Sequence, residues 1–255
     1  MTSILIVQLL VNLLMTNSFH PRPAQPEAIV ESRQLVVVTA KSWEAVDGEL
    51  QCYERGSSGE AWRAVGELIP VAVGRNGLAW GAGLHEKAIE SGPVKKEGDG
   101  KAPAGIFGLS SAFGYVAKDR AAGIKLPYTQ AVATLECVDD PQSPYYNKIL
   151  DRKSVNHPNW KSSEQMLRRD ELYRWGVVVD HNAAREPGCG SCIFLHIWKG
   201  PGQGTAGCTA MERSKIEWLL SWLDPKKKPV LVQLPRAEFD RLGSVWKLPE
   251  RIRKG

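Results

Sequence analysis

The chain has 255 residues, of which 43% are hydrophobic and 24% are charged. This length favours one domain, or at most two, and is ample for a buried core. The composition is ordinary for a globular protein, and the sequence contains no internal repeat or low-complexity tract. The formal net charge of +5 is mild, so it is compatible with an anionic surface or polymer and does not indicate a nucleic-acid partner.

Residues 1–24 are interpreted as a signal peptide or N-terminal leader. Residues 4–15 form an apolar stretch. This stretch is shorter than the roughly 20 residues of a typical membrane-spanning helix, so we expect no stable membrane span. A proline-containing segment follows at 21–26, and we expect cleavage near Ala24 or Ala28. No Lys or Arg precedes the apolar stretch, which leaves an uncleaved anchor or a misplaced start codon as alternatives.

Short β-branched and apolar runs, separated by turn residues, predict a chain rich in β-strands. The expected strands are residues 35–39, 50–55, 61–65, 70–73, 131–138, 175–180, 192–198 and 229–234, with another strand beginning at 106. Segments rich in glycine at 74–83 and 91–105 are predicted as loops.

Two helices are predicted from local patterns. Ser162 and Gln165 form a capping-box pattern, which predicts a helix that continues towards Tyr173. A second helix is expected from Glu212 to Leu223, because its apolar residues recur at i, i+3, i+4 and i+7. Many short strands with two helices indicate a β-rich α+β fold with mixed, sandwich-like sheets.

The five cysteines are an odd number, which leaves at least one thiol unpaired. Cys52, Cys137, Cys189 and Cys192 could form two bridges in any of three pairings and leave Cys208; buried free thiols are the alternative. Cys189 and Cys192 form a C-x-x-C motif, which by itself is typical of thiol-redox chemistry or of half a zinc site. The chain has no second such motif and no histidine pair at metal spacing, so we expect no metal and no cofactor.

A histidine and a cysteine stand near each other on either side of a glycine-rich loop. His196 ends an apolar run, and Cys208 follows the loop at 199–204. The thiolate is the nucleophilic form of cysteine, so a reactive cysteine needs a base, and free backbone N–H groups can hold an oxyanion. The helix predicted from Glu212 could lower the thiol pKa from its N-terminus. A buried structural cysteine and a core histidine are the alternatives.

The segment that ends in Cys208 resembles the active-site motif of the L,D-transpeptidases with a YkuD-type catalytic domain. That motif is a histidine on a strand, a spacer, then Ser/Thr-His-Gly-Cys and an Asn or Arg two positions further. Three positions match the second part: Thr205, Gly207 and Cys208. His196 stands where the family has its base. The family's second histidine is Ala206 here, the Asn/Arg position is Ala210, and the spacer is shorter than usual. These departures suggest a divergent branch.

A second stretch carries the same resemblance. Residues 96–107 are similar to the family's upstream Gly-Asp-Gly-x-Thr-Pro-x-Gly-x-Phe segment, with Ala102 in place of the Thr. The resemblance then covers about residues 90–235. It implies that residues 25–255 form a single catalytic domain of the YkuD-type fold.

The resemblance also implies a role for each site residue. Cys208 is the expected nucleophile and His196 its base, oriented by a backbone carbonyl as in the family. The N–H groups of Gly207 and Cys208 are the expected oxyanion donors. Three further residues are expected to contact the substrate: Thr205, Gly204 and His181. Because His181 ends a predicted strand and enters a loop, it is also the rival candidate for the base.

The implied activity is that of an exported peptidoglycan L,D-transpeptidase in the periplasm or cell envelope. Its partner would be a tetrapeptide stem, whose terminal D-Ala leaves as a thioester forms on Cys208, and an acceptor amine would resolve the thioester. Water as the acceptor would make the same site an L,D-carboxypeptidase. Loss of the family residues at 206 and 210 leaves a non-catalytic wall-binding protein as an alternative. A thiol-redox protein using Cys189 and Cys192 is another.

Overall fold

The computed structural model describes residues 25–85 and 92–252, and the leader predicted over 1–24 lies outside this range. A ten-stranded sheet forms the larger part of the fold, and its main path runs β10-β11-β12-β3-β2-β1-β13-β5-β4. The path closes on itself because β10 also pairs with β5, while β6 joins the other edge of β5. The strands are β1 (Gln34–Ala40), β2 (Asp47–Glu54), β3 (Arg63–Ala72), β4 (Leu78–Trp80), β5 (Ala102–Gly114), β6 (Tyr128–Gln130), β10 (Trp175–Val179), β11 (Phe194–Ile197), β12 (Thr209–Met211) and β13 (Val230–Pro235).

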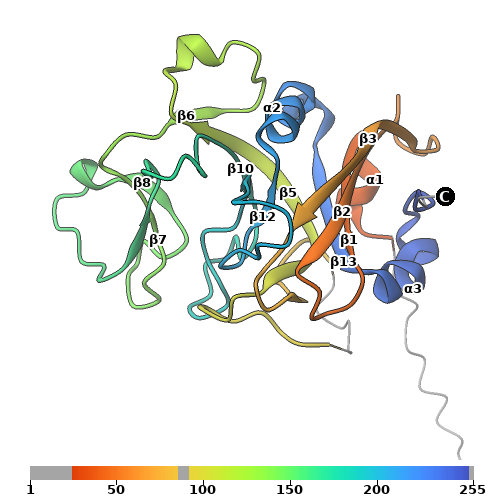
Figure 1. Ribbon diagram of the computed structural model, residues 1–255, viewed down its shortest axis with the longest axis horizontal. Coiled ribbons are helices and arrows are strands. Elements are labelled where there is room, and N and C mark those ends of the chain that lie inside the picture. Colours follow the sequence, from red (N-terminus) through yellow and green to blue (C-terminus); the bar gives the residue numbers. More distant parts are fainter. Residues whose placement is uncertain (1–24, 86–91, 253–255) are drawn as a thin grey trace, which may run out of the picture.

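A smaller sheet of three antiparallel strands stands beside the larger one and is green in Figure 1. It consists of β7 (Leu135–Val138), β8 (Ile149–Asp151) and β9 (Ser163–Gln165), in the order β8-β7-β9. A disulfide between Cys137 on β7 and Cys192, two residues before β11, ties this sheet to the larger one.

Strand β1 is the centre of the main core. Every residue of this β-branched run is buried, because β1 pairs with β2 on one side and in parallel with β13 on the other. A second buried cluster lies under the small sheet and includes Met166, Tyr173, Phe194 and Cys208. The end of β11 and the residues before β12 therefore lie where this second cluster meets the larger sheet.

Three α-helices lie on the outside of the described chain: α1 (Glu27–Glu31), α2 (Arg213–Trp222) and α3 (Arg236–Trp246). The apolar face of α2, with Ile216, Leu219 and Leu220, packs against β10 and β11. Short 3₁₀ turns complete the set: η1 (Lys118–Ala121), η2 (Arg152–Ser154) and η3 (Pro225–Lys227). The α+β, β-rich class and the helix expected at 212–223 are confirmed.

The helix predicted after Ser162 is wrong. Residues 163–165 form strand β9, and the ladder with β7 satisfies their backbone groups. The hydroxyl of Ser163 donates to Glu136 on β7. A capping box is a four-residue pattern, and a partner strand distant in sequence outweighs it here.

Other expectations for strands, helices and disulfides also differ in detail from the structure. The segments 61–65 and 70–73 belong to one strand, β3, and the loop predicted at 74–83 contains the short β4. Helix α3 was not predicted; Pro235 both ends β13 and serves as the N-cap of this helix. Of the two bridges considered, the described residues contain one, and it joins Cys137 to Cys192.

Candidate functional site

A cavity of about 500 Å³ lies beside the junction of β11 and β12. Five of the residues singled out in the sequence line it: His196, Gly204, Thr205, Gly207 and Cys208. The loop at 199–207 supplies the largest group of its lining residues, and His196 of β11 and the segment that leads from β9 to β10 also contribute. The structure thus gathers the candidate nucleophile, the candidate base and the glycine loop around one space.

The parallel pairing of β11 and β12 explains why His196 and Cys208 share this cavity. The register places His196 opposite Ala210, and Cys208 lies two residues before Ala210 on the same strand face. The N–H of Phe194, two residues before His196, donates to Sγ of Cys208 at 3.3 Å. His196 of β11 and Cys208, one residue before β12, therefore both line this cavity, and the thiol itself donates to the carbonyl oxygen of Cys192 at 3.6 Å.

The ring of His196 is held in one orientation. Its Nδ1 lies 2.7 Å from the carbonyl oxygen of Ile197, and Tyr173 packs edge-on against the ring at a centroid distance of 5.1 Å. A carbonyl oxygen can only accept, so Nδ1 carries the proton in the neutral ring and Nε2 is the basic nitrogen. Burial lowers the pKa of His196 to about 4, which keeps the ring neutral near pH 7.

Cys208 is buried, with 5% of its surface exposed. Burial raises the pKa of its thiol to about 12, and Glu164 raises it further; the N–H of Phe194, Lys95 and Tyr173 act in the opposite direction. The helix N-terminus expected to lower this pKa does not adjoin the thiol, because β12 lies between Cys208 and the start of α2. The resting side chain is therefore a protonated thiol.

The turn before Cys208 is held by the hydroxyl of Thr205. This hydroxyl donates to the carbonyl of Cys208 at 2.6 Å and accepts from the N–H of Gly207 at 3.1 Å. Among the described residues, no group accepts a hydrogen bond from the N–H of Cys208. The expected oxyanion donors thus lie on one short turn beside the sulfur, with the Gly207 N–H engaged by Thr205.

The glycine loop lies close to the chain that follows β3. A Cβ placed on Gly204 would come within 2.5 Å of the Cα of Arg75, so this position has no room for a side chain. Backbone bonds join Thr205 to Val73 and Arg75. Ala206 and Ala210, where the family motif has larger polar residues, both line the cavity.

His181 does not line the cavity of Cys208. It is 2% exposed and borders a smaller cavity of about 230 Å³. Its Nε2 lies 2.9 Å from the carbonyl oxygen of Cys189, and its buried Nδ1 has no hydrogen-bond partner within residues 25–85 and 92–252. Burial lowers its pKa to about 4. The structure therefore separates the rival base from the thiol.

Sequence reasoning missed several residues of the cavity wall. Tyr173 contacts the ring of His196, and its hydroxyl donates to Glu164, whose pKa is raised chiefly by burial. Both lie in the segment that was predicted to be a helix, so no local signal placed them at the site. Lys95 also lines the cavity and directly precedes the motif at 96–107.

Comparison with protein families identifies the class. The model of the YkuD family, the L,D-transpeptidase catalytic domain, matches residues 47–232. The chain therefore belongs to this family of cysteine-nucleophile enzymes, as the two sequence motifs indicated. No curated protein and no solved structure gives a significant match.

Two further findings concern the described part of the chain alone. Within residues 25–85 and 92–252, no group of three or more His, Cys, Asp or Glu side chains is placed to hold a metal ion. In the same ranges, no helix is both long and apolar enough to cross a membrane.

Proposed function

We propose that the chain is a peptidoglycan L,D-transpeptidase that uses Cys208 as nucleophile and His196 as base. Membership of the YkuD family supports a peptidoglycan-related acyl transfer. The observation that carries the residue assignment is the shared cavity, in which the Ile197 carbonyl fixes the His196 ring with Nε2 as its basic nitrogen. The same observation favours His196 over His181, which borders a different cavity.

The proposed reaction has two halves. In the first, Nε2 of His196 takes the thiol proton of Cys208, and the sulfur attacks the carbonyl carbon that joins the third stem residue to the terminal D-Ala. The N–H of Cys208 holds the oxyanion, and the N–H of Gly207 joins it by leaving its bond to Thr205. The C–N bond then breaks, and the imidazolium returns the proton to the departing D-Ala amine. A thioester remains on Cys208.

In the second half, an acceptor amine attacks the thioester and His196 takes a proton from the amine. The tetrahedral intermediate collapses, the C–S bond breaks, and the thiol of Cys208 is regenerated as the imidazolium returns a proton to sulfur. Thr205 and Gly204 shape the turn and the loop that the stem peptide would contact. Water in place of the amine would give an L,D-carboxypeptidase from the same two residues.

The test is turnover of a disaccharide-tetrapeptide, followed by liquid chromatography and mass spectrometry. A transpeptidase releases D-Ala and forms a cross-linked dimer, whereas a carboxypeptidase releases D-Ala and leaves a tripeptide. Cys208→Ala should lower the rate by more than about 1,000-fold and remove the thioester adduct from the intact-protein mass spectrum. Turnover that persists in Cys208→Ala contradicts the assignment. A wild-type chain that binds the peptide without any turnover supports the non-catalytic wall-binding protein.

The cellular location is part of the same proposal. We infer export to the periplasm or cell envelope, with residues 1–24 as the leader and 25–255 as one catalytic domain, because the family acts on a wall polymer. Fractionation of producing cells and the intact mass of the envelope form test it. A mature mass that begins near Ala24 or Ala28 is expected, and a full-length chain in the cytoplasm contradicts export.

A further inference from the structure

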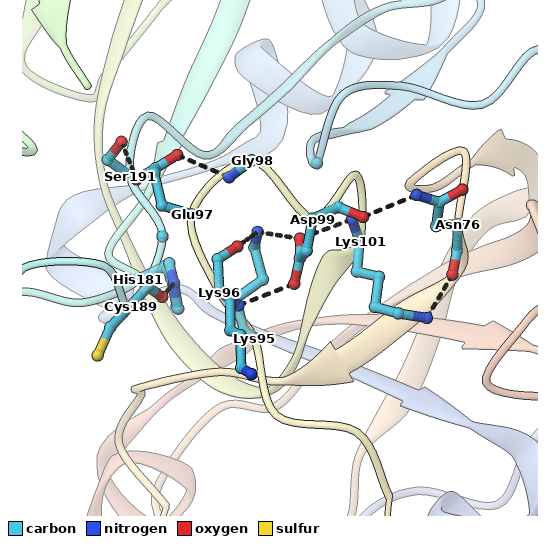
Figure 2. Close-up of polar contacts among 12 residues, drawn as sticks. Asn76, Lys95, Lys96, Glu97, Gly98, Asp99, Lys101, His181, Cys189 and Ser191 are labelled. Carbon is cyan, nitrogen blue, oxygen red and sulfur yellow. Dashed lines mark hydrogen bonds and ion pairs between the residues drawn. The ribbon is translucent and has the colours of Figure 1, made fainter. Parts of the chain in front are cut away.

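Lys95 is a buried cation in the wall of the Cys208 cavity. Its side chain is 4% exposed, and its ammonium contacts Oδ1 of Asp99 at 2.6 Å and the carbonyl oxygen of Lys96 at 2.8 Å (Figure 2). Burying a charged lysine is costly even when it is paired. A role in fixing the loop at 96–101 does not need a charge, because the backbone N–H groups of Lys96 and Lys101 already bind the Asp99 carboxylate.

The ammonium of Lys95 adjoins the turn that carries the nucleophile. A Cβ built on Gly207, the residue before Cys208, would lie 3.9 Å from Nζ of Lys95. An ammonium has three N–H donors, and the two contacts with Asp99 and Lys96 use two of them. The remaining donor has no protein acceptor among the described residues.

The thiol needs such a cation, because its surroundings oppose ionisation. Strand β12 lies between Cys208 and the start of α2, and Cys208 lies within a buried apolar cluster. The titratable or charged side chains that line its cavity come from several elements: Arg75, Lys95, Glu97, Asp139, Glu164, Arg168, Tyr173, His196 and Lys199. Three of these are carboxylates, and Arg168 is paired with Asp170. Electrostatic coupling of Lys95 to Cys208 favours the thiolate.

We propose that Lys95 is the residue whose positive charge stabilises the thiolate of Cys208 as the thiol is activated. The proton passes from Sγ of Cys208 to Nε2 of His196, and Lys95 takes no part in the proton transfer. Lys95 lines the same cavity as Ala206, which stands where the family motif has its second histidine. This inference rests on the proposed nucleophile, but it concerns the thiol itself and needs no substrate to be tested.

The experiment measures how the alkylation rate of Cys208 by iodoacetamide depends on pH, with peptide mass spectrometry to separate Cys208 from the other cysteines. Lys95→Gln keeps a hydrogen-bond donor but removes the charge. This substitution should raise the midpoint of the pH profile for Cys208 alkylation by about one pH unit. Below the midpoint, alkylation should then be about tenfold slower than in the wild type. Lys95→Arg should restore most of the wild-type profile.

Lys101→Gln is the matched control. Lys101 lies in the same loop, but its ammonium extends away from Lys95 to the carbonyl of Asn76 (Figure 2). The control removes the same charge from the chain and should leave the Cys208 midpoint unchanged. A folded Lys95→Gln variant with a wild-type midpoint overturns the proposal, as does an equal shift in both variants. Circular dichroism establishes folding.

A second variant keeps the proposal testable if Lys95→Gln does not fold. Asp99→Asn retains an oxygen that can accept from the loop N–H groups but removes the counter-charge of Lys95, so the Cys208 midpoint should fall. A midpoint that stays or rises overturns the proposal. The turnover of Cys208→Ala tests the proposed enzyme, whereas the alkylation midpoints test the role of Lys95. Failure of one proposal can therefore be distinguished from failure of the other.

Discussion

Among the described residues two histidines are buried, His181 and His196, and they border different cavities. His196 lies on β11 and His181 follows β10, the neighbouring strand; burial lowers the pKa of each to about 4, and each has one ring nitrogen close to a backbone carbonyl oxygen. The two rings differ in which nitrogen lies close to the carbonyl oxygen. His196 binds through Nδ1 and borders the thiol cavity, whereas His181 binds through Nε2 and has no partner for its buried Nδ1 in the described part of the chain. Burial and a lowered pKa are common to both rings, so the proposed choice of base rests on the cavity that each ring borders.

The largest expected difference between His196 and His181 is in the rate of turnover. His196→Ala should lower the rate of D-Ala release by about 100- to 10,000-fold, because general base catalysis is lost. His181→Ala should cause a much smaller loss of turnover rate per folded molecule, since its ring lies outside the cavity.

The same two variants are also compared by the rate at which iodoacetamide alkylates Cys208. His196→Ala should slow alkylation of Cys208 near pH 7, because the neutral base that takes the thiol proton is removed. If only His181→Ala slows it, His181 is the base.

The contrast between the two histidines also shows what the sequence could predict. His196 and Cys208 are separated by one loop, and the strands on either side of that loop pair directly, so a local motif was enough to bring them together. The buried run of β1 and the amphipathic pattern of α2 were predictable for the same reason, since each depends on near neighbours in the chain.

The rest of the cavity wall depends on contacts between distant segments. Glu164 reaches the site because β9 pairs with β7, and this pairing overrides a helix-capping pattern. Cys137 meets Cys192 across a separation of 55 residues, whereas parity alone left three pairings open. The position of Lys95 follows from the fold of the loop around Asp99. No residue pattern within one segment specifies these contacts.

His181 and His196 should contribute equally to the loss of folding stability at acid pH. For each, the folded pKa of about 4 lies below the ordinary value of 6.5, so between these pH values the unfolded chain binds more protons. Stability is present above about pH 6.5 and is lost as the pH falls towards 4. His181→Gln and His196→Gln should each reduce the difference in unfolding free energy between pH 7 and pH 4.5 by about 2 kcal/mol.

Urea unfolding at the two pH values measures this difference. His85, whose pKa burial also lowers to about 4, stays in both variants and contributes equally to them. A variant whose acid sensitivity equals that of the wild type would show that the folded pKa of its histidine lies near the ordinary value of 6.5, so burial does not lower it.

The smallest expected effects on stability and rate come from substitutions in the turn before Cys208 and in the turn after His181. Thr205 bridges the N–H of Gly207 and the carbonyl of Cys208, and Asn182 similarly holds the turn after His181 through bonds to the backbone of Glu186 and Gly190.

Thr205→Val keeps the side-chain shape and should cost about 1 kcal/mol of stability for each hydrogen bond lost. Because the oxyanion donors lie on this turn, it should also slow thioester formation without weakening binding of the tetrapeptide. Asn182→Ala should lower stability but leave thioester formation per folded molecule unchanged. Urea unfolding and single-turnover mass spectrometry separate the two effects. Equal slowing in both variants would mean that the turn beside His181 is coupled to the thiol cavity, and the functional distinction between the two histidines would then fail.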